Sequence, residues 1–465
     1  MPRQVIVIGG GPGGYAAALR AAELGAGVTL FERESLGGTC VNQGCIPTKA
    51  WLRLADLMDG ISRAREMGLN AGQVSIDVVK ARTRVKRIVA ETVSAMTAVL
   101  ATQQVTILTA NAQVLSPCAV AWRDDSGRAG VAEAGAIIVA TGSEPTQLNI
   151  PGYDLDGVIS GDASLDIREV PQSTLVIGGG AIGVEMAYIH RGLGSKVTLV
   201  EIRNQLVSWA SPDFAGALCE AMRALGIEVL LHSSVGDIRS AGRCLEALVS
   251  GCRGTASGTK ILCDKVIVAA GRRPRTRGSG LEATGVKTTP GGFVRVDEHM
   301  RTTVPGVWAV GDVTGIMMLA HVAAAQGRCA AEDAMGLRSS MSYDVVPVCL
   351  YSRPELSKVG LSQDEAERDG RRVVTGRAHF SLNGGAVAQG DSSAMAEVVC
   401  DAGSEEVIGA QIIGPGATEL IAEAASIIAM QGRIGEWAGI IHAHPTLSEV
   451  LQQAAESARR SLKLL

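Results

Sequence analysis

The chain lacks several features that define common classes of protein. Only 3% of its 465 residues are aromatic, and a net charge of −4 gives no electrostatic basis for binding nucleic acid. No apolar run approaches the ~20 residues that a membrane-spanning helix needs. A strand is expected already at Val5, which leaves no room for a signal peptide. We therefore expect a cytoplasmic protein without a membrane span or a nucleic-acid partner, whose cores consist mainly of Ala, Val, Ile and Leu.

Cysteine is too sparse for a fold held together by disulfides, because ten cysteines are spread over the 465 residues. Only Cys40 and Cys45 are close neighbours, in a glycine-rich stretch. In a reducing compartment such a pair is more often catalytic or metal-binding than structural. The other eight are expected to be small buried hydrophobic residues. They are Cys118, Cys219, Cys244, Cys252, Cys263, Cys329, Cys349 and Cys400.

What the sequence does contain is a repeated strand–helix–strand pattern. Residues 4–32 and 174–201 each comprise an apolar strand, a glycine turn, an Ala-rich helix and a second strand that ends in an acid, Glu32 or Glu201. Glycines spaced as G-x-G-x-x-G let the backbone approach a pyrophosphate at the helix N-terminus. These glycines are Gly9, Gly11 and Gly14 in the first copy and Gly178, Gly180 and Gly183 in the second. One match is weak, but two complete units predict two dinucleotides, for which FAD and NAD(P) are the economical pair.

The acid that ends the second copy bears on the choice of nicotinamide cofactor. The carboxylate of Glu201 would repel a 2′-phosphate, which favours NAD over NADP, although Arg203 lies close by in the sequence.

The remaining segments suggest how the chain is divided. Further apolar strands are predicted to end near Ala140, Ala270 and Gly311. After about residue 346, short strands and helices are typical of a separate α+β domain. We expect an α/β chain with two Rossmann-like dinucleotide-binding domains and a C-terminal α+β domain. The expected divisions are 1–145, 146–272, 273–345 and 346–465.

Three interpretations of Cys40 and Cys45 compete. Zinc ligation would need two further Cys or His residues at ligand spacing, and the sequence has no second close cysteine pair. Inert core cysteines would not need the glycines that surround the pair. A redox dithiol is favoured by the helix that residues 46–49 predict, because a helix N-terminus lowers a thiol pKa. Lys49 can add positive charge there, or can be an ordinary solvated lysine.

A second candidate cluster lies near the C-terminus, where His442 and His444 precede Glu449. In a purely structural role, Thr446 or Ser448 caps the next helix and Glu449 occupies its first turn. In a functional role, His444 is a general base near neutral pH that Glu449 orients. Metal binding by the two histidines lacks an obvious third ligand. Spacing alone does not decide between these roles.

Together these motifs resemble the pyridine nucleotide–disulfide oxidoreductase family, from Val5 to Leu465. The matching segments are 9–14, 37–45, 140–142, 178–183, 311–312 and 444–446. The resemblance implies a flavoprotein with FAD in the first unit and NAD(P)H in the second. It also implies that 273–345 completes the FAD domain and that 346–465 forms a dimerisation domain.

The resemblance further implies roles for single residues. Cys40 and Cys45 would form the redox disulfide, with Cys40 attacked by substrate and Cys45 nearer the flavin. Lys49 would pair with Glu185 beside the isoalloxazine. His444 and its partner Glu449 would come from the opposite subunit of a homodimer. Other residues expected to contact the cofactors are Thr141, Gly142, Gly271, Gly311, Asp312, Ala320 and His321.

Segments 442–449, 319–321 and 45–49 are similar to the members that oxidise dihydrolipoyl groups with NAD⁺. That implies a carrier-bound lipoyl substrate, with electrons passing through Cys40–Cys45 and FAD. The C-terminus has no cysteine pair of the kind that mercuric and large thioredoxin reductases use. The alternatives are an NAD(P)H-dependent reductase of another small disulfide and a non-enzymatic flavoprotein subunit. Departures from the family pattern at Ala181, Val322 and Glu397 leave the partner complex open.

Overall fold

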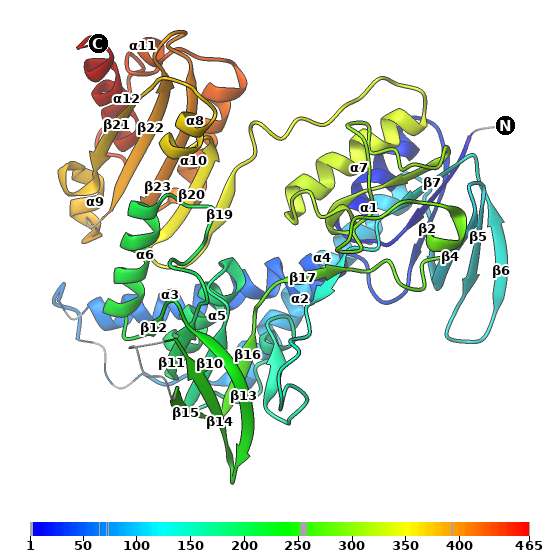
Figure 1. Ribbon diagram of the computed structural model, residues 1–465, viewed down its shortest axis with the longest axis horizontal. Helices are drawn as coiled ribbons and strands as arrows, with labels where there is room; N and C mark the ends of the chain where they lie inside the picture. Colours follow the sequence, from blue (N-terminus) through cyan, green and yellow to red (C-terminus); the bar gives the residue numbers. More distant parts are fainter. Residues whose placement is uncertain are drawn as a thin grey trace.

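The computed structural model describes residues 3–64, 66–70, 72, 74–251, 258–391 and 394–464. Figure 1 shows three parts, each built on its own five-stranded sheet. The first contains the N-terminus, the second lies below it in the middle of the chain, and the third contains the C-terminus. Among the described helices none is both long and apolar enough to cross a membrane.

The first sheet is parallel, with strand order β18-β7-β1-β2-β3. Its strands are β1 (Gln4–Ile8), β2 (Gly27–Glu32), β3 (Thr106–Thr109), β7 (Ala136–Val139) and β18 (Val307–Ala309). Residues Val5–Ile8 and Ala136–Val139 are buried without interruption, as expected of parallel strands covered on both faces. Strand β18 comes from far along the chain and pairs with β7, so the segment after residue 272 contributes to the first sheet.

Helices α1 (Pro12–Glu23) and α7 (Ala320–Ala334) lie side by side against this sheet (Figure 1). Two glycines explain how closely they approach. A Cβ at Gly327 would lie 2.1 Å from the carbonyl oxygen of Gly13, so a side chain there would force the helices apart. An antiparallel ribbon of β4 (Asn111–Ser116), β5 (Ala119–Arg123) and β6 (Ala129–Glu133) extends this part of the molecule.

The second sheet is also parallel, with strand order β12-β11-β10-β16-β9. Its strands are β9 (Val158–Ser160), β10 (Ser173–Ile177), β11 (Lys196–Val200), β12 (Glu228–Leu230) and β16 (Lys265–Val268). Helices α5 (Ala181–Gly192) and α6 (Pro212–Ala224) pack against it. A three-stranded antiparallel sheet of β13 (Ser234–Ala241), β14 (Cys244–Ser250) and β15 (Thr259–Cys263) adjoins it.

The third sheet is antiparallel, with strand order β19-β20-β23-β22-β21. Its strands are β19 (Val348–Leu350), β20 (Glu355–Gly360), β21 (Val373–His379), β22 (Met395–Asp401) and β23 (Val407–Gly414). The helices of this part are α8 (Gln363–Arg368), α9 (Gly384–Gln389), α10 (Ala417–Ala429), α11 (Ile434–Trp437) and α12 (Glu449–Leu462). The predicted fold class is therefore confirmed: two Rossmann-like dinucleotide-binding units and a C-terminal α+β domain. The division points within the chain stay a prediction.

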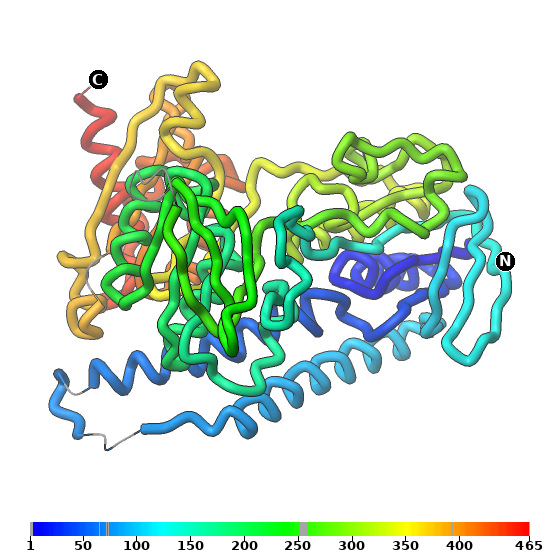
Figure 2. The backbone as a smooth tube through the Cα atoms, turned by 60° about the horizontal axis from the view of Figure 1, so that its bottom comes forward, coloured from blue at the N-terminus to red at the C-terminus, as the bar shows by residue number. Residues whose placement is uncertain are grey.

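Three helices connect the first two parts. They are α2 (Gly38–Gln43), α3 (Cys45–Ala64) and α4 (Val78–Thr102), and Figure 2 shows α4 running beside α3 along one edge of the molecule. Helix α3 packs against α5, where a Cβ at Gly192 would lie 2.6 Å from the Cβ of Ala55. Short strands β8 (Ser143–Pro145) and β17 (Arg272–Pro274) pair where the chain passes between the two sheets.

The residues that are buried agree only in part with those that the composition predicted to form the cores. The cores consist mostly of Ala, Val, Ile and Leu, but the largest fully buried side chains include Trp51 and Trp437. Of the scattered cysteines, Cys219, Cys263, Cys329 and Cys400 are buried. The prediction is wrong for three others, because Cys118 is exposed and Cys244 and Cys349 are half-buried. Cys252 lies outside the described residues.

Candidate functional site

A cleft of about 1110 Å³ extends from the first glycine turn to the beginning of α3. Both predicted redox cysteines line it, as do Lys49 and Glu185. The members of the predicted FAD set that line it are Gly9, Gly11, Glu32, Lys49, Thr141, Gly142, Gly311, Asp312, Ala320 and His321. Gly14 lies beneath the turn instead. A Cβ at Gly14 would be 1.8 Å from the carbonyl oxygen of Gly9, so this glycine is needed for packing.

The first glycine turn fits a dinucleotide on two counts. Gly9 has φ +102°, and a Cβ there would lie 2.3 Å from the Ala140 carbonyl oxygen, so the turn excludes side chains. The hydroxyl oxygen of Thr141 is buried beside the cleft and has no hydrogen-bond partner in the described part of the chain. An orphaned hydroxyl at the wall of a glycine-lined cleft fits a polar ligand such as the FAD backbone. The Glu32 carboxylate accepts the Gly10 N–H at 2.7 Å, which holds the turn against β2.

A polar network not found by sequence reasoning lies on the opposite wall. The Arg272 guanidinium donates to both carboxylate oxygens of Asp162, at 2.8 and 3.0 Å, and to the Ser143 hydroxyl at 2.7 Å. That hydroxyl in turn donates to Asp312. The network joins β8, β17 and η4 (Gly311–Thr314), so it fixes the carboxylate of Asp312 in the cleft. The sequence feature that could have indicated this network is Arg272, which follows Gly271 at the end of a predicted strand.

The second glycine turn repeats the geometry of the first. Gly178 has φ +110°, and a Cβ at Gly183 would lie 1.8 Å from the carbonyl oxygen of Gly178. Glu201 is 8% exposed, and its carboxylate accepts the N–H groups of Gly179 and Arg203. Gly178, Gly180, Gly183, Glu201 and Gly271 do not line the described cleft. It reaches the second unit only at Ala181, Ile182, Glu185 and Met186.

The two redox cysteines lie on successive helices. Cys40 is in α2, and Cys45 is the first residue of α3. Gly44 allows the tight connection, since a Cβ there would lie 2.9 Å from the Thr39 carbonyl oxygen. Both cysteines are free thiols in the structure, and their side chains are hydrogen-bonded to each other. This proximity is the geometric requirement for a disulfide that opens and closes.

The two thiols have opposite tendencies to ionise. The hydrogen bond from Cys40 lowers the pKa of Cys45 to about 7, assisted by the positive charge of Lys49 and opposed by burial. The same hydrogen bond, together with burial, raises the pKa of Cys40. When the pair is reduced, the shared proton therefore stays on Cys40 and Cys45 is the thiolate.

This asymmetry predicts the pH dependence of the reduced protein. A thiolate against a flavin gives a long-wavelength charge-transfer band, which should be present above pH 7 and fade as the pH falls through about 7. The variant Lys49→Met, which removes the positive charge, should shift the midpoint of the charge-transfer titration to higher pH. The measurement is an anaerobic pH titration of the two-electron-reduced, FAD-loaded protein. A band whose intensity does not change between pH 5 and 9 would refute the assignment.

Lys49 and Glu185 form the charged centre of the cleft. The Lys49 ammonium lies 3.1 Å from Glu185 Oε1 and 3.2 Å from Oε2, an ion pair between α3 and α5. Tyr351 contacts both partners. Its backbone N–H donates to Glu185 Oε1 at 3.1 Å, and its ring centroid lies 4.0 Å from the Lys49 nitrogen. Tyr351 was not among the predicted site residues, and it enters the site from the third part of the chain.

We expect Tyr351 to position the Lys49 ammonium through its ring. The variant Tyr351→Leu should slow flavin reduction by NADH about 3- to 10-fold and raise the midpoint of the charge-transfer titration, because a cation–π contact of this kind is lost. The variant Tyr351→Phe keeps the ring and should behave like the parent protein in both assays. Equal losses in the two variants would instead point to the hydroxyl group.

The C-terminal histidines lie in the third part of the molecule. His444 Nδ1 is 2.9 Å from Glu449 Oε1, and the other Glu449 oxygen accepts the Thr446 N–H at 2.9 Å. The side chain of His444 is 75% exposed. Neither residue is among the described residues that line the cleft of the same chain, and α12 lies far from α2 in both views (Figures 1 and 2). His442 is instead packed against Glu423, with Nε2 2.9 Å from its carboxylate.

Further observations concern His321, two departures from the family pattern and the metal ligands. His321 Nε2 lies 3.0 Å from the Pro347 carbonyl oxygen, which ties the beginning of α7 to the third part. Gln326, in the segment that departs from the family pattern, is buried and accepts the Gly311 N–H at 2.7 Å. Glu397, another departure, is buried and paired with Arg377 at 2.6 Å. No group of three or more potential metal ligands occurs in the described part of the chain.

This geometry, a dithiol beside a lysine–glutamate pair in a dinucleotide cleft, defines a flavoprotein disulfide reductase. Comparisons with known proteins lead to the same class. Residues 3–327 match the family described as pyridine nucleotide-disulphide oxidoreductase, and residues 346–455 match the dimerisation domain of that family. The chain therefore belongs to the pyridine nucleotide–disulfide oxidoreductase family. Members of this family bind FAD and a pyridine nucleotide.

Several relatives match over nearly their whole length. The dihydrolipoyl dehydrogenase of Chlorobaculum tepidum is 37% identical, covering 98% of this chain and 97% of the relative. That of Bacillus subtilis is 35% identical, covering 96% and 97%. The crystal structure of LpdA from Mycobacterium tuberculosis superposes with a TM-score of 0.91 at 26% identity, covering 99% of each chain.

Proposed function

We propose that the protein is a dihydrolipoamide dehydrogenase, which oxidises a dihydrolipoyl group on a carrier protein and reduces NAD⁺. The observation that carries this proposal is the His444–Glu449 pair. A carboxylate 2.9 Å from Nδ1 holds one imidazole nitrogen, and the exposed ring leaves Nε2 available to a substrate. A base is needed because a dithiol attacks a disulfide only as the thiolate. The dihydrolipoyl dehydrogenases among the relatives support the same substrate.

In this proposal the residues act in sequence. His444 takes a proton from the dihydrolipoyl thiol, and the resulting thiolate attacks Cys40, which breaks the Cys40–Cys45 bond. The second substrate thiol then also loses its proton by way of His444, and its thiolate displaces Cys40, so the lipoyl disulfide forms. Of the two protons released, one stays on Cys40 and the other passes from His444 to solvent. Cys45 is the sulfur that stays ionised, because its pKa is lowered to about 7 beside Lys49. FAD, when bound, supplies the two-electron transfer from the dithiol to the nicotinamide.

The cofactor set in this proposal follows the two glycine turns. Gly9, Gly11, Gly14, Glu32, Thr141, Gly142, Gly311 and Asp312, with Ala320 and His321, hold FAD. Gly178, Gly180, Gly183, Glu201 and Gly271 hold NAD. Lys49 and Glu185 lie where the two cofactors would meet. Glu201 favours NAD because its buried carboxylate would face the adenosine ribose.

The active site would be shared between the subunits of a homodimer. His444 and Glu449 belong to the dimerisation domain, while the cysteines belong to the first part of the chain. A base from one subunit would therefore serve the dithiol of the other.

A substrate panel tests the proposal directly. The FAD-loaded protein should oxidise dihydrolipoamide with NAD⁺ at least about 100-fold more efficiently, in kcat/KM, than it reduces other small disulfides with NADH or NADPH. Glutathione disulfide and cystine are suitable competitors. A preference for one of these over lipoamide would establish the alternative, a reductase of another low-molecular-weight disulfide.

The same assay tests the choice of nicotinamide cofactor. Replacing the acid in Glu201→Ala should narrow the preference for NAD⁺ over NADP⁺ about tenfold or more, because a repulsion between the carboxylate and the 2′-phosphate is removed. Glu228→Ala, an acid on the neighbouring strand β12, is the matched control and should leave the preference unchanged. A wild-type protein that used NADP⁺ equally well would contradict the role of Glu201.

A further inference from the structure

A second cavity, of about 730 Å³, adjoins the cofactor cleft. Its walls come from α2, the beginning of α3, α4 and the turn after β9. It shares six lining residues with the cleft, namely Ser35, Asn42, Gln43, Asp162, Leu165 and Arg275. Its volume is typical of small-molecule sites, which measure roughly 300–1,000 Å³. None of the chemistry proposed above uses it.

One wall of the cavity is apolar. Val85, Val89 and Val93 line it at intervals of four residues, so they form one stripe along α4. Val85 is buried, but Val89 and Val93 are only half-buried. The stripe therefore has a surface that the protein itself leaves partly uncovered and that a hydrocarbon can cover.

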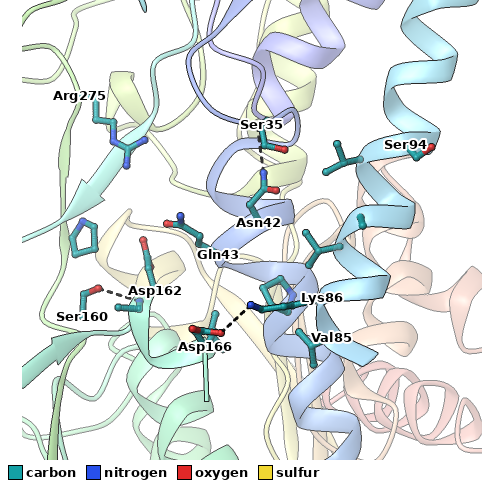
Figure 3. Close-up of a pocket in the computed structure, with 17 residues that line it drawn as sticks. Ser35, Asn42, Gln43, Val85, Lys86, Ser94, Ser160, Asp162, Asp166 and Arg275 are labelled. Carbon is teal, nitrogen blue, oxygen red and sulfur yellow. Dashed lines mark hydrogen bonds and ion pairs between the residues drawn. The ribbon is translucent and has the colours of Figure 1, made fainter. Parts of the chain in front are cut away.

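The opposite side of the cavity carries a positive charge. Arg275 Nε is buried and makes no hydrogen bond to any residue that the structure describes. The carboxylate of Glu144 lies 3.8 Å from it, beyond hydrogen-bond range, and already accepts Arg273 at 2.7 Å. Burial and the nearby charge of Arg33 lower the pKa of Arg275, so an added negative charge would stabilise the guanidinium. Figure 3 shows Arg275 across the cavity from Lys86 and Ser94 of α4, with Asn42 and Gln43 between them.

The acidic groups of the lining are paired within the protein. Asp162 is held by Arg272 at 2.8 Å, and Asp166 is paired with Arg82 at 2.6 Å. Lys86 lies 3.7 Å from Asp166, beyond hydrogen-bond range (Figure 3). Among these described residues two cations, Arg275 and Lys86, thus keep free donors for an anionic group.

We propose that this cavity binds a small apolar carboxylate. Its carboxylate would pair with the Arg275 guanidinium, and its hydrocarbon part would cover the valine stripe of α4. Occupancy should be visible at the flavin, because Asn42 and Gln43 belong to the helix that carries Cys40 and they directly precede the turn to Cys45.

The test uses octanoate as the probe and the FAD-loaded dimer as the protein. Flavin fluorescence and titration calorimetry should show saturable binding of one octanoate per chain. Octylamine, of the same length but opposite charge, should bind at least about tenfold more weakly. Arg275→Gln should weaken the binding of octanoate about tenfold or more, since a charged hydrogen bond is lost. Ala90→Phe, on the cavity side of α4, should abolish binding by filling the space.

Two matched variants on the exposed surface of α4 serve as controls. Arg84→Gln and Ala98→Phe repeat the same changes at exposed positions that do not line the cavity, and both should bind octanoate normally. Absence of saturable octanoate binding to the parent protein would overturn the proposal. It would equally be overturned if Arg275→Gln and Ala90→Phe bound octanoate as tightly as the parent. It would also be overturned if Arg275→Gln released FAD while the loaded fraction still bound octanoate as the parent does, because the guanidinium would then serve the cofactor.

Discussion

The variant Cys45→Ser should lose lipoamide turnover by about 10⁴-fold or more while it still binds FAD. A serine hydroxyl cannot form the bond to Cys40, and its oxygen does not ionise near neutral pH. The proposed FAD site depends on the glycine turn, Thr141 and Asp312. None of these residues is hydrogen-bonded to residue 45 in the structure. The measurement is steady-state turnover with dihydrolipoamide and NAD⁺, with the flavin content read from the absorption spectrum.

The companion variant Cys40→Ser should be equally inactive but spectroscopically different. Its serine hydroxyl can still donate a hydrogen bond to the remaining thiol, and Lys49 is unchanged, so Cys45 should be a thiolate even without reduction. A charge-transfer band should therefore be present in the resting Cys40→Ser protein and absent from Cys45→Ser. Cys118→Ser, at an exposed position, is the control and should match the parent. The assignment of the two sulfurs would be wrong if the band appeared in the other variant.

The sequence predicted those features whose requirements are local. The glycine spacing reflects a positive φ at Gly9 and a close contact between Gly14 and the Gly9 carbonyl oxygen, and the structure has both. The same holds for the stretch around Cys40 and Cys45, where Gly44 permits the tight connection between two helices. Buried parallel strands were recognisable because they are continuous apolar runs.

Features that depend on distant parts of the chain were not predictable in this way. Tyr351 reaches the Lys49–Glu185 pair from the third part of the chain, and nothing in its local sequence indicates that it contacts residues so far away. The network around Arg272 joins residues up to 169 positions apart, between Ser143 and Asp312. The predicted burial of Cys118 also failed, because Cys118 is a turn residue between two strands. Pairing over such separations is set by tertiary packing, which a single sequence does not display.

The variant His444→Ala should lower lipoamide turnover about 10²- to 10⁴-fold, because proton transfer by a positioned base contributes on that order. Flavin reduction by NADH should stay near the parent rate, since that half of the reaction needs no base at the lipoyl site. Glu449→Gln should give a smaller loss of the same kind. Its carboxylate holds Nδ1 at 2.9 Å and stabilises the imidazolium that forms when His444 takes the proton. Equal loss in the NADH half-reaction would indicate a folding defect instead.

Mixing the two inactive variants separates a shared site from a site within one chain. In a mixed dimer of Cys45→Ser and His444→Ala, one site combines Cys45 of one subunit with His444 of the other, and the second site lacks both. Each mixed dimer should then have about half the parent activity, and a random mixture about a quarter, if the base acts across the interface. The measurement requires co-expression with two affinity tags and purification of the mixed species. A mixed dimer as inactive as its parents would place base and dithiol in the same chain, which the exposed His444, remote from the cleft of its own subunit, argues against.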